Sequence, residues 1–308
     1  LFRSEFKLGD SNMKDNIMKE AREIFYNPLF RDKLDTNRDL LCVKNGVLDF
    51  KQGVFRRGNP EDYMSLCTQT EYIPIQRAGL PADYYTQSSS VPYEPMSKQL
   101  DFKAMDSGRC WLELLESEKY QETDDEIIAN IYDFMNKIFT NESLREYMWQ
   151  HLASSLLGYT SQTFNMYIGK GSNGKSVLTK LMSDLLGEYK GDVPLTLITE
   201  KRQKIGGLAP EIVDLKGVRF ALIQESSKGD VLNEGIMKQL TSGIDVIQGR
   251  GLFQSSATKF YPQFELVICS NEMLEIRSQD GGTWRRVRKI EFESKFTDNP
   301  DPKNPKEF

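Results

Sequence analysis

The stretch from residue 164 to 176, Phe-Asn-Met-Tyr-Ile-Gly-Lys-Gly-Ser-Asn-Gly-Lys-Ser, constrains the fold of this chain more than any other feature. Gly169, Gly174, Lys175 and Ser176 match G-x-x-x-x-G-K-[ST], the pattern of a phosphate-binding loop. Glycines let the backbone turn tightly, so that successive N–H groups point at phosphate oxygens. The lysine then reaches the β- and γ-phosphates, and the hydroxyl ligates Mg²⁺. The pattern predicts an ATP and Mg²⁺ site formed by Gly169, Lys170, Gly171, Ser172, Asn173, Gly174, Lys175 and Ser176.

Both flanks of this loop suit the motif. Residues 164–168 form a short apolar run typical of a strand, and apolar residues recur at helical spacing after Ser176. Gly187 then stands where a C-terminal cap of that helix is expected. The order strand, loop, helix predicts an α/β P-loop NTPase fold, in which helices cover both faces of a parallel sheet.

Composition restricts the other possibilities. The 308 residues suffice for two domains, and contents of 39% hydrophobic and 28% charged residues are typical of a soluble globular protein. No run approaches the ~20 apolar residues of a membrane span, so no membrane partner is expected. Four scattered cysteines and the single His151 predict neither a disulfide framework nor a zinc site, and favour a reducing, intracellular compartment. The chain begins without Met or a signal-peptide pattern, so we expect a piece of a longer protein.

Turn and capping signals indicate the domain organisation. Residues 1–38 show an apolar face at helical spacing, which predicts a helix packed on a core. Residues 39–74 are predicted to form a small β-rich module, with a hairpin at Asn45–Gly46 and a further strand within 64–72. Thr123 to Glu126 is a capping box that opens the first of two helices. We therefore predict a smaller α+β domain over 1–123 and, over 124–308, a helical pair followed by the ATPase domain.

Two further strand ends carry polar residues suited to hydrolysis. Glu225 and Asn271 each follow an apolar run. Because α/β sheets bind ligands at the carboxyl ends of their strands, both are expected beside the loop. Glu225 is predicted to bind Mg²⁺ with Ser176 and to polarise water, and Asn271 to contact the γ-phosphate or the water. The residue before Glu225 is Gln224, so the usual acidic pair is reduced to one carboxylate.

Two adjacent arginines follow a Gly-rich bend. Arg285 and Arg286 come shortly after Gly281–Gly282. A guanidinium in such a place suits a finger that reaches the γ-phosphate of a neighbouring subunit. We favour Arg286 for this role, with Arg285 second. The alternative is that both are ordinary surface arginines on an edge strand.

The order of these motifs resembles the superfamily 3 helicases. It is most similar to the poxvirus-type primase-helicases of large DNA viruses and to related phage primase-helicases. In that family a P-loop, an acidic strand end, a segment with Lys and Arg, a strand ending in Asn and an arginine finger follow one another, here over 169–292. The segment Leu40 to Leu48 also resembles the domain that precedes the helicase in that family.

The resemblance implies an AAA+-like helicase motor that forms a homo-hexameric ring around single-stranded or forked DNA, with ATP between subunits. A β-hairpin in the channel would correspond to residues 246–260. DNA contacts are then expected at Lys238, Arg250, Phe253 and Lys259. It also implies an upstream primase domain in the full-length protein and an intracellular location at virus replication sites in the host cytoplasm. The acidic chain, with a net charge of −5, is locally basic here, with seven basic and four acidic residues over 246–290.

Two other functions stay open. A P-loop kinase would need an acceptor pocket and an Arg-rich lid, and no such insertion is evident. A nucleotide-regulated assembly module that hydrolyses ATP negligibly is the other, and Gln224 in place of an acid is the feature that favours it. Turnover with and without single-stranded DNA separates all three.

Overall fold

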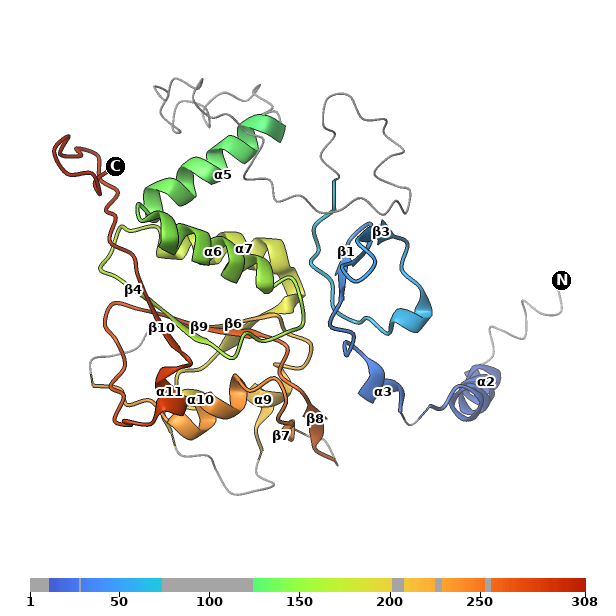
Figure 1. Ribbon diagram of the computed structural model, residues 1–308. Coiled ribbons are helices and arrows are strands. Elements are labelled where there is room, and N and C mark those ends of the chain that lie inside the picture. The colour runs from blue at the N-terminus through green and yellow to red at the C-terminus, as the bar shows by residue number, and fades with distance from the viewer. Residues whose placement is uncertain (1–10, 28, 74–123, 201–207, 225–228, 253–255) are drawn as a thin grey trace.

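A five-stranded parallel sheet forms the centre of the molecule (Figure 1). The computed structural model describes residues 11–27, 29–73, 124–200, 208–224, 229–252 and 256–308. Its strand order is β10-β4-β9-β6-β5, and every neighbouring pair is parallel. The five carboxyl ends therefore share one edge of the sheet, the carboxyl edge, and the five amino ends share the opposite amino edge. The strands are β4 (Phe164–Ile168), β5 (Lys190–Val193), β6 (Phe220–Gln224), β9 (Glu265–Ser270) and β10 (Val287–Glu291).

Helices cover both faces of this sheet (Figure 1). One face packs against α5 (Asp124–Ile138), α6 (Glu142–Ser154) and α7 (Lys175–Leu186), and the other against α8 (Thr196–Thr199), α9 (Pro210–Val213) and α10 (Glu234–Leu240). Two short elements, α11 (Gly281–Trp284) and η5 (Gly187–Tyr189), complete this region. Side chains alternate between two cores, so Met166 of β4 joins one cluster and its neighbour Tyr167 the other. The predicted α/β P-loop fold is confirmed.

A small antiparallel sheet precedes the central one. It consists of β1 (Leu40–Val43), β2 (Gly46–Asp49) and β3 (Val54–Arg56), and the predicted hairpin turns at Asn45. The short helix η1 (Pro60–Asp62) follows. The expectation of a strand within 64–72 is wrong: the segment follows β1 irregularly, since Gln69 has a φ of 64° and Asn45 binds both the N–H and the carbonyl of Tyr72.

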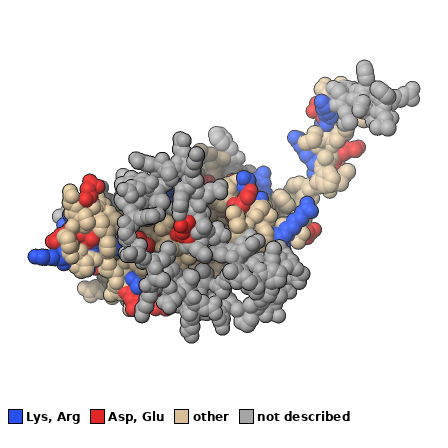
Figure 2. Space-filling view, turned by 90° about the horizontal axis from the view of Figure 1, so that it is seen from above, with Lys and Arg blue, Asp and Glu red and all other residues tan. Residues whose placement is uncertain are grey.

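The amino-terminal helix does not pack as predicted. It forms as α2 (Ser11–Ile24), followed by the single turn α3 (Phe30–Lys33), but α2 has no buried residue. Ile24 at its end is 73% exposed. Figure 2 shows α2 standing away from the rest of the molecule, with basic and acidic side chains on its surface. Helical spacing predicted the helix, but packing on a core depends on the rest of the fold and not on that spacing.

The small antiparallel sheet and the central parallel sheet share one core. Leu41 of β1 lies in the same apolar cluster as Leu178 of α7 and Phe220 of β6. The predicted domain boundary at residue 124 follows a range that the structure does not describe, and it stays a prediction. Among the described helices, none is long and apolar enough to cross a membrane.

Candidate nucleotide-binding site

The loop between β4 and α7 has the backbone that a phosphate-binding loop requires. Gly174 has a φ of 82° and Ser172 a φ of 59°, both in the left-handed region. A Cβ on Gly169 would clash with Nδ2 of Asn173, whereas one on Gly171 would meet nothing within 4 Å. The loop is therefore close-packed at its start and open at Gly171.

Neighbouring segments hold this loop from behind. Asn173 is buried and its Nδ2 donates to the carbonyl of Phe292 at 3.3 Å. The N–H of Phe296 donates to the carbonyl of Ser172 at 2.7 Å. Side chains of Ile138 and Phe296 pack around Gly174. The segment that follows β10 thus fixes the loop, and Asn173 is directed toward that segment.

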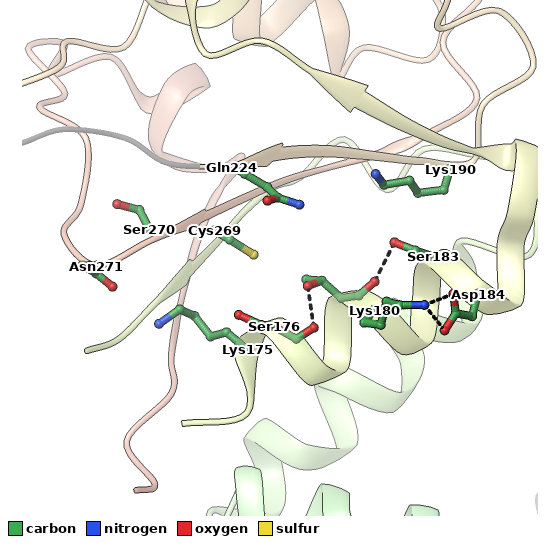
Figure 3. Close-up of a pocket in the computed structure, with 11 residues that line it drawn as sticks. Lys175, Ser176, Lys180, Ser183, Asp184, Lys190, Gln224, Cys269, Ser270 and Asn271 are labelled. Atoms are coloured by element: carbon green, nitrogen blue, oxygen red, sulfur yellow. Dashed lines mark hydrogen bonds and ion pairs between the residues drawn. The ribbon is translucent and has the colours of Figure 1, made fainter. Parts of the chain in front are cut away.

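Lys175 begins α7 and faces the space in front of the loop (Figure 3). Its Nζ donates to the carbonyl of Gly169 and lies 3.3 Å from Oδ1 of Asn173. Both partners are neutral oxygens, and burial lowers the pKa of Lys175. An anion beside this ammonium would supply the opposite charge that the loop itself lacks.

A cavity of about 750 Å³ lies along α7 and the carboxyl edge. Asn271, directly after β9, lies on the same side of it as Lys175, and Gln224 ends β6 above it (Figure 3). Its lining comprises Lys175, Ser176, Thr179, Lys180, Ser183, Asp184, Lys190, Gln224, Cys269, Ser270 and Asn271. The lining therefore unites the loop with the carboxyl ends of β6 and β9 and with Lys190 at the start of β5.

The donor set fits a nucleotide phosphate with Mg²⁺. The Ser176 hydroxyl borders the cavity beside Lys175, and Mg²⁺ takes few protein ligands because phosphates and water supply the rest. Within the described ranges no group of three or more His, Cys, Asp and Glu could hold a metal by itself. Glu225, the predicted second metal ligand, lies outside the described residues.

The far wall of the cavity was not predicted from the sequence. Lys180 and Asp184 form an ion pair one helical turn apart on α7, and Thr179 and Ser183 lie beside them. Polar residues at spacing i, i+4 on a helix that follows a P-loop are the signal that could have indicated this wall. Cys269 lines the same cavity, and burial raises the pKa of its thiol to about 12, so the thiol is protonated.

The two arginines lie far from this cavity. The N–H of Phe164, at the start of β4, donates to the carbonyl of Arg286 at 2.7 Å. That contact places Arg286 at the amino edge, whereas the loop follows the carboxyl end of β4, five residues or about 16 Å away. Nη1 of Arg286 donates to the carbonyl of Gly282 at 2.8 Å, while Arg285 is exposed. Neither guanidinium lines the cavity of its own chain.

The predicted hairpin forms from β7 (Ile247–Gly249) and β8 (Thr258–Phe260). Lys259 is exposed on β8, and Arg250, after β7, is half-buried. Lys238 instead pairs with Asp280 and, with the N–H of Gly282, holds the pKa of that carboxyl at about 2. Phe253 lies outside the described residues.

The first strand of the parallel sheet leads through a glycine-rich loop into α7. The protein therefore belongs to the α/β class of the P-loop type. Comparison with known proteins indicates the family. Residues 1–128 match the family described as D5 N terminal like. “Putative helicase L207/L206” of Acanthamoeba polyphaga mimivirus is 34% identical over 94% of this chain and 25% of that protein.

Other relatives come from further large DNA viruses. “Putative helicase 022R” of Frog virus 3 is 28% identical over 93% of this chain and 31% of its own length. “Putative primase C962R” of African swine fever virus is 26% identical over 99% of this chain and 27% of its own. These matches confirm the resemblance to the primase-helicases of large DNA viruses, and the chain is homologous to them. It spans about a quarter to a third of their length.

Among solved structures, “The A form apo structure of NrS-1 C terminal region-CTR” aligns with 58% of this chain and 40% of its own chain. The TM-score is 0.43 and the sequence identity 16%. The fold assignment therefore rests on the strand order and the loop described above.

Proposed function

We propose that this chain is the ATP-hydrolysing motor of a DNA helicase within a viral primase-helicase. One observation carries the proposal: Lys175, Ser176 and Asn271 line one cavity at the carboxyl edge, while Arg285 and Arg286 lie at the amino edge of the same sheet. The first set can bind and orient a triphosphate. The second cannot reach it within one chain, which supports a role at the nucleotide of a neighbouring subunit.

Each residue at the cavity has a chemical task in this proposal. Backbone N–H groups around Gly171 and the ammonium of Lys175 bind the phosphates, and Ser176 with Glu225 holds Mg²⁺. Glu225 also polarises the attacking water, and the amide of Asn271 orients that water or the γ-phosphate. When bound there, Mg²⁺ would supply positive charge against the phosphates.

Assembly into a homo-hexamer is part of the proposal. Besides the two arginines, α7 presents an apolar stripe at spacing i, i+4, i+8: Val177, Leu181 and Leu185 are 52%, 46% and 46% exposed. This stripe runs along the helix that borders the cavity. A second copy seated there would cover it and bring its own Arg286 toward the first copy's γ-phosphate.

Single-stranded or forked DNA is the proposed track. The hairpin between β7 and β8 would carry Lys259 and Arg250 into the channel, with Phe253 for stacking and Lys238 in the segment before it. The homologues' names favour helicase or primase proteins of viral replication. An upstream primase domain and a location at replication sites in the host cytoplasm belong to the same proposal.

Mixing two inactive variants tests the shared site. Arg286→Ala should abolish phosphate release and leave ATP binding intact, because the finger acts on the neighbour. Lys175→Ala should lose both. An equimolar mixture should regain part of the activity, since some interfaces combine an intact loop with an intact finger. A mixture that assembles but stays inactive would refute the role in trans, and Arg285→Ala repeats the test for the second arginine.

Steady-state phosphate release with and without single-stranded DNA tests the activity itself. We expect turnover that DNA stimulates. Phosphate transfer to an acceptor without release would indicate a kinase. Negligible turnover in assembled particles would indicate a nucleotide-regulated assembly module, the function that Gln224 before Glu225 would suit.

A further inference from the structure

A cluster of one arginine and two tyrosines lies at the base of the hairpin. The guanidinium carbon of Arg38 is 5.6 Å from the ring centre of Tyr159 and 5.9 Å from that of Tyr261. The two tyrosines are 47% and 49% exposed. These residues come from three separate parts of the chain: the segment before β1, the segment after α6, and the residue directly after β8.

Buried contacts hold this cluster from behind. The carbonyl of Arg38 accepts from the N–H of Gly158 at 2.8 Å and from Nη1 of Arg219 at 3.2 Å. Arg219 is only 2% exposed, and a Cβ on Gly158 would clash with its Nη1. On the outer side, Nη2 of Arg38 donates to the carbonyl of Gly243 at 3.2 Å. The guanidinium therefore has a fixed place.

The exposed face of the hairpin continues this cluster. In the antiparallel register Gln248 lies opposite Lys259, and Val246 and Tyr261 flank the two strands one residue beyond the last pair, Ile247 with Phe260. All four side chains are exposed, while Ile247 and Phe260 between them are buried. The exposed face thus carries the cation Lys259, and the aromatic ring of Tyr261 and the apolar side chain of Val246 lie toward Arg38.

We propose that Tyr261, Arg38 and Tyr159 form a stacking site for the bases of single-stranded DNA that enters or leaves the hairpin. Aromatic rings stack on any base, and a guanidinium plane both stacks on bases and pairs with phosphate. A half-exposed tyrosine held against a fixed guanidinium offers such a surface. Lys259, two residues from Tyr261, supplies the charge for the backbone.

Two carboxylates and two cations lie around this cluster. Asp39 accepts a hydrogen bond from the hydroxyl of Tyr159 at 3.0 Å, and this bond raises the pKa of that tyrosine. Asp245 is exposed on the turn before β7. Arg38 and Lys259 are the cations on the side of Tyr261.

The site makes the amino-terminal module part of the DNA path. Arg38 precedes β1, in the region that matches the D5 N terminal like family, whereas the hairpin belongs to the ATPase region. This inference rests on the proposed function, because it requires that the chain binds single-stranded DNA. It extends the contact from the hairpin tip to the hairpin base and to a residue before β1.

Binding of a fluorescent oligo-dT strand to the 308-residue chain tests the site. Tyr261→Ala should raise the Kd about tenfold, since stacking of one base contributes on the order of 1–3 kcal/mol. Its dependence on salt should stay that of the wild type, because no charge is lost. Arg38→Met should weaken binding and also reduce the salt slope by about 0.7. Tyr159→Phe keeps the ring and should bind like the wild type.

Controls separate this site from general damage. Tyr26→Ala removes an exposed tyrosine outside the cluster and should leave the Kd unchanged. ATP binding and turnover without DNA should be unchanged in Tyr261→Ala, and Tyr261→Leu repeats the test with a side chain of similar bulk. If the wild type binds DNA and both Tyr261 variants bind equally well, the stacking site is refuted and the proposed function stands. If the wild type binds no single-stranded DNA, both are refuted.

Discussion

The two edges of the central sheet differ in how their polar groups are satisfied. At the carboxyl edge, Lys175, Ser176 and Asn271 border an open cavity, and the Lys175 ammonium donates to neutral oxygens of its own loop. At the amino edge, Arg219 is buried and bonded to another segment of the chain, although its Nε has no hydrogen-bond partner. Arg219 donates to the carbonyls of Asn37, Arg38 and Leu40 at 3.0–3.2 Å.

A second buried group shows the same pattern. Glu265, the first residue of β9, is 1% exposed and accepts from the N–H and the hydroxyl of Ser161 at 2.8 and 2.7 Å. His151 lies 2.9 Å from the hydroxyl of Tyr167. One edge therefore keeps polar groups available for a ligand, and the other uses them to join segments of the chain. Variants of the cavity residues at the first edge should lose activity, and variants of the buried Arg219 and His151 at the second should lose stability.

The largest effect is expected for Lys175→Ala. Loss of the ammonium removes a charge that contacts the phosphates, so phosphate release should fall by about a thousandfold. The midpoint of thermal unfolding should not fall, because burial already disfavours this charge. Lys44→Ala, an exposed lysine paired with Glu71 at 3.8 Å, is the matched control. A large loss of stability in Lys175→Ala would break the comparison.

Arg219→Met should show the opposite behaviour. Three carbonyls lose a donor, although that of Arg38 keeps the N–H of Gly158. An unpaired buried acceptor costs about 1–3 kcal/mol, partly offset because burial of the charge is itself costly. Burial lowers the pKa of Arg219 to about 10, which reports that cost. We expect the free energy of unfolding, measured in urea, to fall by about 3 kcal/mol. Arg277→Met, at an exposed arginine, should leave it unchanged.

The pH dependence of stability sharpens the comparison for the amino edge. Burial lowers the pKa of His151 from 6.5 to about 4. As the pH falls, the unfolded chain therefore takes up a proton at this residue before the folded chain does. Stability from this group is present above pH 6.5 and is lost as the pH falls to about 4. His151→Gln should show a flatter decline over that interval. An unchanged decline in this variant would mean that the imidazole is not kept neutral.

Glu265 acts in the opposite direction and must be separated from His151. Burial raises its pKa, so its contribution is present at low pH and is lost as the pH rises through the folded pKa. Its Oε2 lies 3.9 Å from Nδ1 of His151, but a neutral imidazole makes no ion pair. Glu265 is present in both proteins. The difference in the pH dependence of stability between the wild type and His151→Gln therefore reports the contribution of the histidine.

The smallest effect is expected for Lys180→Ala. An exposed i, i+4 pair contributes about 0.3–0.5 kcal/mol, so loss of the pair with Asp184 should barely change unfolding. Lys180 lines the far part of the cavity, and the KM for ATP should stay within about twofold of the wild type. A larger rise in KM would show that the nucleotide occupies that far part.

Local patterns were sufficient for much of the fold. Apolar runs predicted β4, β6 and β9, and Asn141, which accepts from the N–H of Leu144, begins α6 at the expected place. The turn at Asn45 and the hairpin of β7 and β8 also formed. The packing of α2 and a strand within 64–72 were wrong, because neither depends on local spacing alone.

The sequence by itself determined the phosphate-binding loop and the residues around it. Gly169, Gly174 and Lys175 act through backbone freedom and charge within one short segment, so their order along the chain carries the information. Placing Arg286 at the opposite edge from that loop required the parallel pairing of β4 with β10. Only the tertiary structure decided that distance.

Arg219 and Arg38 show the same limit more clearly. Nothing near Arg219 in the sequence distinguishes it from a surface arginine, and its partners Asn37, Arg38 and Leu40 lie 182, 181 and 179 residues away. Likewise, Arg38, Tyr159 and Tyr261 become neighbours only through the fold. Burial and long-range contact are properties of packed elements, whereas a loop that turns on its own glycines is a property of the chain.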